Sequence, residues 1–237
     1  MGKSILILGA SGMVGGQVLR HSIDHPEVDK IFVLTRSELA IKDQKLQQTI
    51  HTDYLNYHKI VPILSKVDIV SFCIGVYTGK IDKKGFYEVT VDIPVALAKK
   101  LKEVNPNCTF CLLSGAGADS KEKSRFLFAR TKGIAENRLQ NLLPNFYSFR
   151  PGYIYPTQPR KAVNFLYGLF DLLYSKISKF KWRFLKIKFF QQIALNTSIT
   201  SEQLGRAILD VGLNGYVHKI IEHKEIHSIN RKLVLIT

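Results

Sequence analysis

Short apolar stretches bounded by turn residues recur along the chain about every 20 to 40 residues. Such stretches are typical of strands buried on both faces of a parallel sheet. The five strongest are residues 4–8, 31–35, 67–73, 109–114 and 146–150. Weaker strand patterns at 49–52 and 219–222 bring the predicted sheet to about seven strands.

Between these stretches the apolar positions change to helical spacing, at about residues 13–24, 85–103 and 125–143. Alternation of strand and helix predicts an α/β fold of the Rossmann type, a doubly wound parallel sheet. The length of 237 residues suits one such domain spanning 1–237. The composition changes after Pro151, so we expect residues of about 153–200 to add a small C-terminal lobe on the substrate side.

Composition is ordinary for a globular protein, with 46% hydrophobic and 22% charged residues. The chain has no apolar stretch of the roughly 18 residues that a membrane-spanning helix needs. Because the first predicted strand begins at Ser4, a secretory leader is not expected, and the sequence predicts a cytosolic protein. The net charge of +15 creates a field that attracts phosphates, nucleic acid or anionic lipid without specificity.

The three cysteines, Cys73, Cys108 and Cys111, are an odd number and lie in or beside predicted strands. Residues three apart on a strand point to opposite faces of the sheet, so Cys108 and Cys111 do not form a redox or metal pair. We therefore expect core thiols rather than a disulfide framework.

A glycine-rich turn joins the first predicted strand to the first predicted helix. It reads Gly9-Ala10-Ser11-Gly12-Met13-Val14-Gly15, which is GxxGxxG spacing. Gly9 permits a tight turn, Gly12 lets backbone approach a pyrophosphate, and Gly15 allows the helix to pack closely. Free amides at the helix N-terminus complete an anion site, so the sequence predicts a dinucleotide-binding unit.

The residues that end the second and third strands predict which dinucleotide binds. An acidic residue that would hold a ribose 2′-hydroxyl is absent from Thr35-Arg36-Ser37. Arg36 instead suits a 2′-phosphate, and such a contact favours NADP(H) by about 1 to 3 kcal/mol, although NAD(H) stays possible. Asp53 is placed to meet the adenine, although it reads equally well as a turn residue.

Several further motifs, in order along the chain, make the sequence resemble a known group of proteins. With the glycine turn they include Phe72-Cys73-Ile74-Gly75, Leu112-Leu113-Ser114, Phe149-Arg150-Pro151-Gly152 and Ser198-Ile199-Thr200. The chain resembles the atypical short-chain dehydrogenases related to the Tat-interacting protein, a small NADPH-binding family. The resemblance implies that the cofactor also contacts Cys73, Ile74, Gly75, Ser114, Lys132, Pro151, Gly152 and Tyr153.

The chemistry that the resemblance implies is hydride transfer, with a Tyr as general acid or base four residues before a Lys. The Lys is present as Lys132, where it would hold the nicotinamide ribose, and Ser114 would contact the substrate oxygen or the nicotinamide amide. Phe128 occupies the position of the Tyr, and phenylalanine cannot transfer a proton. Tyr77, Tyr153 and Tyr155 are candidate replacements because loops at the carboxyl edge of the sheet bind ligands.

Two functions therefore remain open. The first is an NADP(H)-dependent, epimerase-like oxidoreductase acting on a small carbonyl, enone or sugar-nucleotide-like substrate. The second is a non-catalytic NADP(H)-binding interaction or sensor protein, which the missing Tyr favours. A homodimer through the 125–143 helix would fit either function.

Residues 160–190 contain nine aromatic residues and eight Lys or Arg against the single acid Asp171. Within them, 163–190 is expected to line the substrate pocket or cover the sheet. The competing interpretation is a peripheral contact with an anionic membrane. No recognised nucleic-acid module is present, so no specific nucleic-acid partner is expected. His218, His223 and His227 are expected to be surface residues rather than metal ligands.

Overall fold

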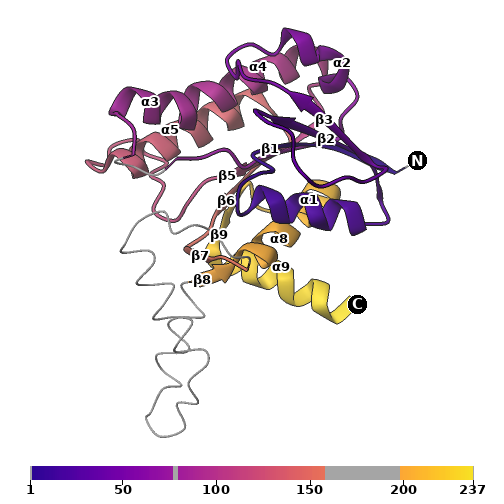
Figure 1. Cartoon of the computed structure of the whole chain (residues 1–237). Coiled ribbons are helices and arrows are strands. Elements are labelled where there is room, and N and C mark those ends of the chain that lie inside the picture. Colours follow the sequence, from indigo (N-terminus) through magenta and orange to yellow (C-terminus); the bar gives the residue numbers. More distant parts are fainter. Residues whose placement is uncertain (1, 77–79, 158–197, 237) are drawn as a thin grey trace, which may run out of the picture.

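The computed structural model describes residues 2–76, 80–157 and 198–236 (Figure 1). These residues form a seven-stranded sheet in the order β3-β2-β1-β4-β5-β6-β9, and every neighbouring pair is parallel. The order reverses between β1 and β4, which is the doubly wound pattern. The predicted fold class and the number of strands are confirmed.

The strands of this sheet agree with the apolar stretches to within a few residues. They are β1 (Lys3–Leu8), β2 (Val28–Thr35), β3 (Leu46–Ile50), β4 (Ile69–Phe72), β5 (Thr109–Leu113), β6 (Phe146–Arg150) and β9 (Ile220–Glu222). Side chains on successive strand positions alternate between two cores. In β1, Ile5 and Ile7 face one core, whereas Leu6 and Leu8 face the other. Burial on both faces explains why the strands read as continuous apolar runs.

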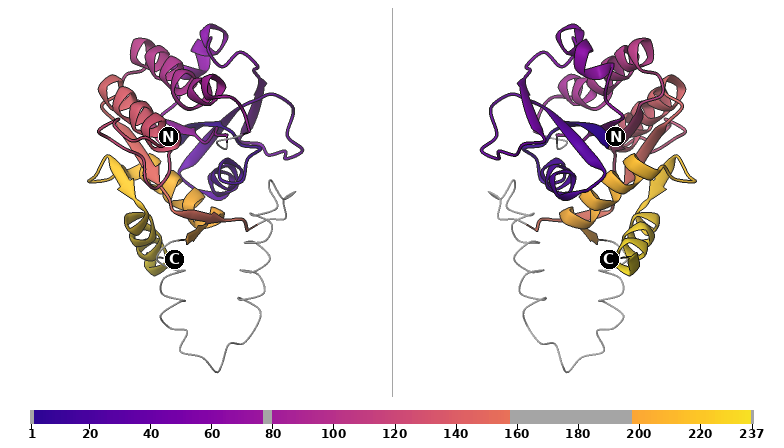
Figure 2. Two further views of the ribbon diagram at one scale, coloured as in Figure 1. Left: turned by 90° about the vertical axis from the view of Figure 1, so that its left-hand side faces the viewer. Right: turned by 90° about the vertical axis from the view of Figure 1, so that its right-hand side faces the viewer.

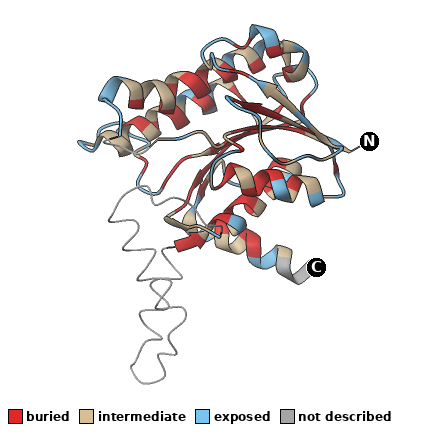
Figure 3. Cartoon of the chain, in the orientation of Figure 1, coloured by how far each residue is buried: buried red, intermediate tan, exposed pale blue. Residues whose placement is uncertain are grey.

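Helices cover both faces of the sheet (Figure 2). One face carries α1 (Gly15–Asp24), α8 (Ser201–Asn214) and α9 (His223–Ile236), and the other carries α2 (Val61–Leu64), α3 (Lys83–Tyr87), α4 (Ile93–Val104) and α5 (Leu127–Leu142). Figure 3 shows the buried residues concentrated in the strands and on the helix sides that face them.

The helix predicted over 85–103 is divided, which corrects the sequence prediction. It consists of α3, a π-helical turn at Glu88–Asp92, and α4, which begins at Ile93 with Pro94 in its first turn. Proline has no backbone N–H to donate and its ring crowds the preceding turn. The wide π turn therefore accommodates Pro94 and keeps the two helical segments on one face of the sheet.

A second, two-stranded sheet pairs β7 (Tyr153–Tyr155) with β8 (Ser198–Thr200) in parallel. The ends of the segment predicted as the C-terminal lobe are thus held together at one place. Thr200 then caps α8: its hydroxyl accepts from the Gln203 amide, and the Gln203 side chain accepts from the Thr200 amide. The single-domain division of the chain stays a prediction.

Candidate functional site

The glycine turn between β1 and α1 has the geometry of an anion site. Gly9 has φ +86°, a conformation that glycine adopts without strain, and its carbonyl accepts from the Gly12 amide at 2.9 Å. Ser11 and Gly12 are exposed, and no side chain caps the start of α1. The Gly16 and Gln17 amides already donate to the carbonyls of Gly12 and Val14, so the exposed part of the turn at Ser11 and Gly12, beside the positive dipole end of α1, is where a phosphate group would approach.

Close packing explains two of the glycines. A Cβ on Gly9 would lie 2.8 Å from the carbonyl carbon of Cys73, and a Cβ on Gly15 would lie 2.3 Å from the Gly9 carbonyl oxygen. Real Cβ atoms do not approach backbone so closely, so a side chain at either position would force the turn away from the sheet. The turn, the start of α1 and the end of β4 thus form one tightly fitted unit.

Three residues that the resemblance assigns to the cofactor, Cys73, Ile74 and Gly75, follow β4 next to this turn. The Cys73 amide donates to the Leu8 carbonyl at 2.9 Å, which extends the pairing of β4 with β1 by one residue. Cys73 and Ile74 are half-buried, and Gly75 is exposed with open space around its Cα. These residues lie at the topological switch point, where ligands of open α/β sheets bind.

Arg36 and Asp53 follow the neighbouring strands β2 and β3, and both are exposed. The Asp53 carboxylate accepts from the Leu55 amide at 3.2 Å, so it stabilises its own turn. Burial raises the pKa of the Tyr54 hydroxyl, and the positive charge of Arg36 opposes that shift. Arg36 therefore lies near Tyr54, and its side chain is accessible to a ligand.

An aromatic cluster that the sequence analysis missed lies at the end of β3. The His51 ring stacks on Tyr57 with centroids 5.4 Å apart, and it meets Tyr54 edge-on at 5.3 Å. Nε2 of His51 and the Tyr57 hydroxyl are buried and have no hydrogen-bond partner in the described part of the chain. The spacing of these rings along a turn gives no periodic signal, and only the fold brings them together.

The predicted catalytic residues converge around the end of β5. Nζ of Lys132 donates at 3.1 Å to the carbonyl of Leu113, the residue before Ser114. Ser114 is 8% exposed, and its Oγ has no hydrogen-bond partner among the described residues. The Phe128 ring lies over Gly115, since a Cβ there would be 2.7 Å from Cζ of the ring. The structure thus brings Ser114, Lys132 and Phe128 to one place.

Burial changes the protonation of the ionisable groups here. It lowers the pKa of Lys132 to about 8, against the raising effects of Glu136 and of Cys73. It raises the pKa of the Cys73 thiol to about 11, a shift that the Ser71 hydroxyl and Lys132 reduce. At neutral pH Lys132 is therefore a cation with a proton that is unusually easy to release, and Cys73 is a neutral thiol.

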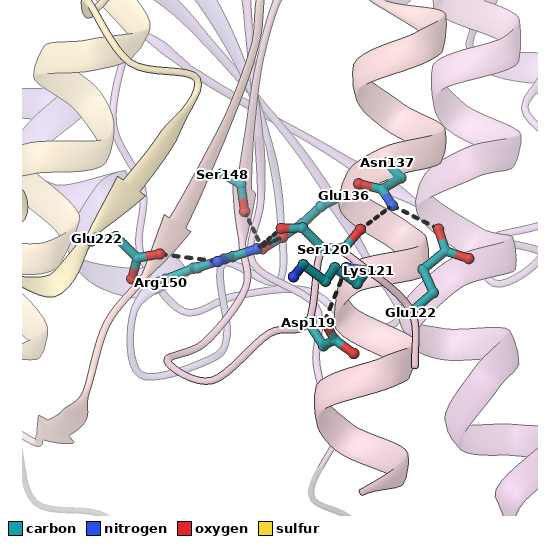
Figure 4. Close-up of polar contacts among 9 residues, drawn as sticks. All are labelled: Asp119, Ser120, Lys121, Glu122, Glu136, Asn137, Ser148, Arg150 and Glu222. Atoms are coloured by element: carbon teal, nitrogen blue, oxygen red, sulfur yellow. Dashed lines mark hydrogen bonds and ion pairs between the residues drawn. The ribbon is translucent and has the colours of Figure 1, made fainter. Parts of the chain in front are cut away.

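A buried ion pair joins α5, the helix that carries Lys132, to β6, and Figure 4 shows its two side chains, Glu136 and Arg150. Glu136, one turn further along α5, pairs with Arg150 of β6, and the two side chains are 1% and 8% exposed. Ser148 donates to Glu136 at 2.8 Å, and Arg150 also donates to Glu222 at 3.0 Å and to Ser120 at 2.7 Å. The sequence analysis missed Glu136, although its position four residues after Lys132 places both on one face of α5.

The predicted segment Pro151-Gly152-Tyr153 is fixed from two sides. The Ala116 amide donates to the Pro151 carbonyl at 2.8 Å, and the Gly152 amide donates to Nδ1 of His223 at 3.0 Å. Tyr153 and Tyr155 are half-buried in β7, while Tyr77 and residues 163–190 lie outside the described part of the chain.

The histidine prediction is wrong for two of the three residues. His218 is exposed, but His223 and His227 are half-buried, with ring centroids 4.8 Å apart. Burial and the neighbouring His227 lower the pKa of His223, in that order. They are drawn inward because α9 follows β9 directly and packs on the sheet. Among the described residues no group of three His, Cys, Asp or Glu side chains is arranged to hold a metal ion.

The cysteines lie where the strand pattern predicts. Cys108 packs in the core on one side of the sheet and Cys111 in the core on the other. All three cysteines are free thiols, and burial raises the pKa of Cys108 to about 12 and that of Cys111 further. In the described ranges no helix has the length and apolar character needed to span a membrane.

Comparison with known proteins identifies relatives of the expected kind. The chain is 28% identical over 156 residues to protein HTATIP2 of Rattus norvegicus, a match that covers 64% of this chain and 63% of the relative. It is 28% identical over 166 residues to protein FMP52 of Lodderomyces elongisporus, covering 65% and 68%. The match thus spans just under two thirds of the rat relative's length. No family model matches the chain.

Solved structures with the same fold confirm the architecture. A short-chain dehydrogenase family protein of Francisella tularensis superimposes with a TM-score of 0.65 at 11% identity, covering 96% of this chain and all of that protein. The enzyme WbmG of Bordetella bronchiseptica, solved in complex with NAD, gives 0.65 at 14% identity, covering 99% and 79%. The resemblance inferred from the motifs is therefore confirmed: the relatives are HTATIP2 and FMP52, and the fold is that of short-chain dehydrogenases.

One expectation is overturned by these comparisons. The FMP52 proteins of Lodderomyces elongisporus and Saccharomyces cerevisiae, both 28% identical to the chain, are mitochondrial. The prediction of a cytosolic protein is therefore wrong. It rested on the few residues before the first strand, and neither those residues nor the fold determines a compartment.

Proposed function

We propose that the chain is an NADP(H)-dependent oxidoreductase of the atypical short-chain type, acting on a small carbonyl compound. One observation carries the proposal. The glycine turn after β1, the Cys73 segment after β4 and the Ser114–Lys132 centre after β5 follow adjacent strands at the same edge of the sheet. A dinucleotide lying along this edge would place its phosphates on the turn and its nicotinamide beside Lys132.

The residues present fit such a cofactor. The uncapped start of α1 suits a pyrophosphate, and the open space at Gly75 suits a ribose. The buried Ser114 hydroxyl lacks a partner among the described residues, and a nicotinamide amide or a substrate oxygen would supply one. The bound cofactor would supply the hydride, while these residues would bind and orient it.

The preference for NADP(H) is supported by Arg36. It is exposed at the end of β2, where the sequence has no acidic residue to hold a ribose 2′-hydroxyl. A guanidinium binds a phosphate with two parallel, charge-assisted hydrogen bonds. An uncharged 2′-hydroxyl does not form an equally strong contact with it.

A second function, a non-catalytic NADP(H)-binding sensor, is favoured by Phe128. The resemblance implies a tyrosine at this position, and the Phe128 ring, which lies over Gly115, carries no hydroxyl. A sensor would need the cofactor site and not the acid. The two functions differ in whether bound NADPH is ever consumed.

Restoring the hydroxyl separates the two functions. We expect Phe128→Tyr to raise the rate of NADPH oxidation, with 4-nitrobenzaldehyde or menadione as acceptor, by on the order of 10²-fold, the low end for a positioned acid. Phe126→Tyr is the matched control because Phe126 is 80% exposed two residues earlier. Tight NADPH binding with no turnover, in the natural chain and also in Phe128→Tyr, would reject the oxidoreductase and support the sensor.

A further inference from the structure

We propose that Lys132, whose Nζ donates to the Leu113 carbonyl at the end of β5, is itself the proton donor to the substrate oxygen. This inference rests on the proposed function. It assigns the proton-transfer step to a residue that the resemblance would use only to hold the cofactor ribose.

The geometry places the amine of Lys132, an ionisable group, at the end of β5. Phe128, one helical turn earlier, covers Gly115 with a ring that has no exchangeable proton. The Lys132 amine uses one of its three N–H groups on the Leu113 carbonyl at 3.1 Å, which leaves two for other acceptors. Ser114 Oγ, on the next residue and without a partner in the described chain, can accept one of them or pass a proton onward.

The charges around Lys132 do not prevent it from releasing its proton. Glu136 is the nearest acid on the same helix face, but its carboxylate accepts from Arg150 and from Ser148. The Glu136 charge raises the pKa of Lys132, but by less than burial lowers it. Lys132 makes no ion pair with a carboxylate of the described residues, and burial therefore dominates and lowers its pKa to about 8.

The other titratable group that acts on Lys132 is Cys73, at the end of β4. Its thiol has a pKa raised to about 11, so it stays protonated at neutral pH and releases its proton less readily than Lys132 does. An acid with a pKa near the working pH is the efficient one for proton transfer. Of the two groups, Lys132 meets this condition.

The step balances as follows. The substrate carbonyl carbon accepts a hydride from the reduced nicotinamide, which is oxidised, and the carbonyl π bond breaks. The carbonyl oxygen takes a proton from Nζ of Lys132, directly or through Ser114 Oγ. A C–H and an O–H bond form, the product is an alcohol, and Lys132 is left as a neutral amine that regains a proton from water.

The first test is independent of activity. The full chain labelled with ¹⁵N-lysine is titrated by NMR, and the Lys132 signal is assigned by its loss in Lys132→Arg. We expect Lys132 to titrate near pH 8, well below the ordinary lysine value of about 10.4. Titration of Lys132 near that ordinary value would overturn the proposal.

The second test follows the reaction with 4-nitrobenzaldehyde and NADPH. Reduction needs protonated Lys132, so kcat should be flat below pH 8 and fall above it, and the reverse oxidation should show the opposite dependence. Lys132→Arg keeps the charge but not the releasable proton, so at saturating NADPH it should lose on the order of 10² to 10⁴ in kcat. The control Lys121→Arg should match the natural chain.

Different results would overturn the proton-donor proposal and the proposed function. Lys132→Arg that reduces the aldehyde as fast as the natural chain would overturn the proton-donor proposal and leave the oxidoreductase intact. Absence of NADPH and NADH binding to the natural chain would reject the proposed function, and with it the transfer step, even where Lys132 titrates near pH 8.

Discussion

The two ends of the candidate cofactor crevice are built in different ways. At the proposed phosphate end, Gly9 and Gly12 belong to a turn at the surface, and Arg36 is exposed. At the nicotinamide end, Lys132 and the Glu136–Arg150 pair are charges held inside the protein. The groups at the first end are exposed to water, so their charges cost little stability. At the second end, burial of the charges lowers the stability of the fold and changes the pKa of Lys132.

This difference predicts the largest effect for Glu136→Gln. The substitution leaves the buried charge of Arg150 with the exposed Glu222 as its remaining ion-pair partner among the described residues, so the free energy of unfolding should fall by about 3 to 5 kcal/mol. Urea unfolding followed by circular dichroism measures the change.

The exposed pair of Glu202 with Arg206 on α8 is the matched control. Glu202→Gln should change the free energy of unfolding by less than about 1 kcal/mol because solvent screens the pair. Equal effects of the two substitutions would contradict the distinction between a buried and an exposed ion pair.

A smaller effect, and on affinity rather than stability, is expected for Arg36→Ala. Loss of the guanidinium should weaken NADPH binding by about 1 to 3 kcal/mol, leave NADH binding nearly unchanged, and leave the unfolding midpoint where it was. Calorimetric titration of both cofactors measures this. Arg20→Ala, which removes an exposed arginine on α1, controls for the loss of one positive charge, and a similar loss of NADPH affinity there would contradict a specific phosphate contact.

The smallest effect concerns pH. The folded chain lowers the pKa of His223 below 6.5, so the unfolded chain binds the proton more readily. Stability from neutral His223 is therefore fully present above pH 6.5 and is lost as the pH falls through the lowered pKa. Protonation of Nδ1 would also break the hydrogen bond from Gly152.

Melting temperatures between pH 7 and pH 5 provide the measurement. His223→Gln should have a flatter dependence on pH than the natural chain, while His58→Gln, at an exposed position, should follow the natural chain. Parallel curves for all three proteins would show that His223 does not contribute.

The phosphate end was predictable from the sequence because its signals are local. Gly9, Gly12 and Gly15 lie within seven residues, and the apolar run of β1 precedes them directly. The nicotinamide end was predictable only in part. Ser114, Phe128 and Lys132 were found through the resemblance, whereas the Glu136–Arg150 pair joins α5 to β6 and has no local signature.

Other differences have equally physical causes. The division of the 85–103 helix follows from Pro94, whose missing N–H the apolar spacing does not register. The pairing of β7 with β8 joins two three-residue strands more than 40 positions apart, too short for any periodic pattern. The inward positions of His223 and His227 depend on how α9 packs after β9, which residue type alone does not reveal.

Calorimetric titration of the natural chain with NADPH and with NADH tests the central claim most directly. We expect one cofactor molecule to bind per chain, and NADPH to bind more tightly than NADH by about 1 to 3 kcal/mol through Arg36. Absence of heat with either cofactor, confirmed by an unchanged melting temperature at high cofactor concentration, would contradict the claim that the glycine turn and the Lys132 centre form a dinucleotide site.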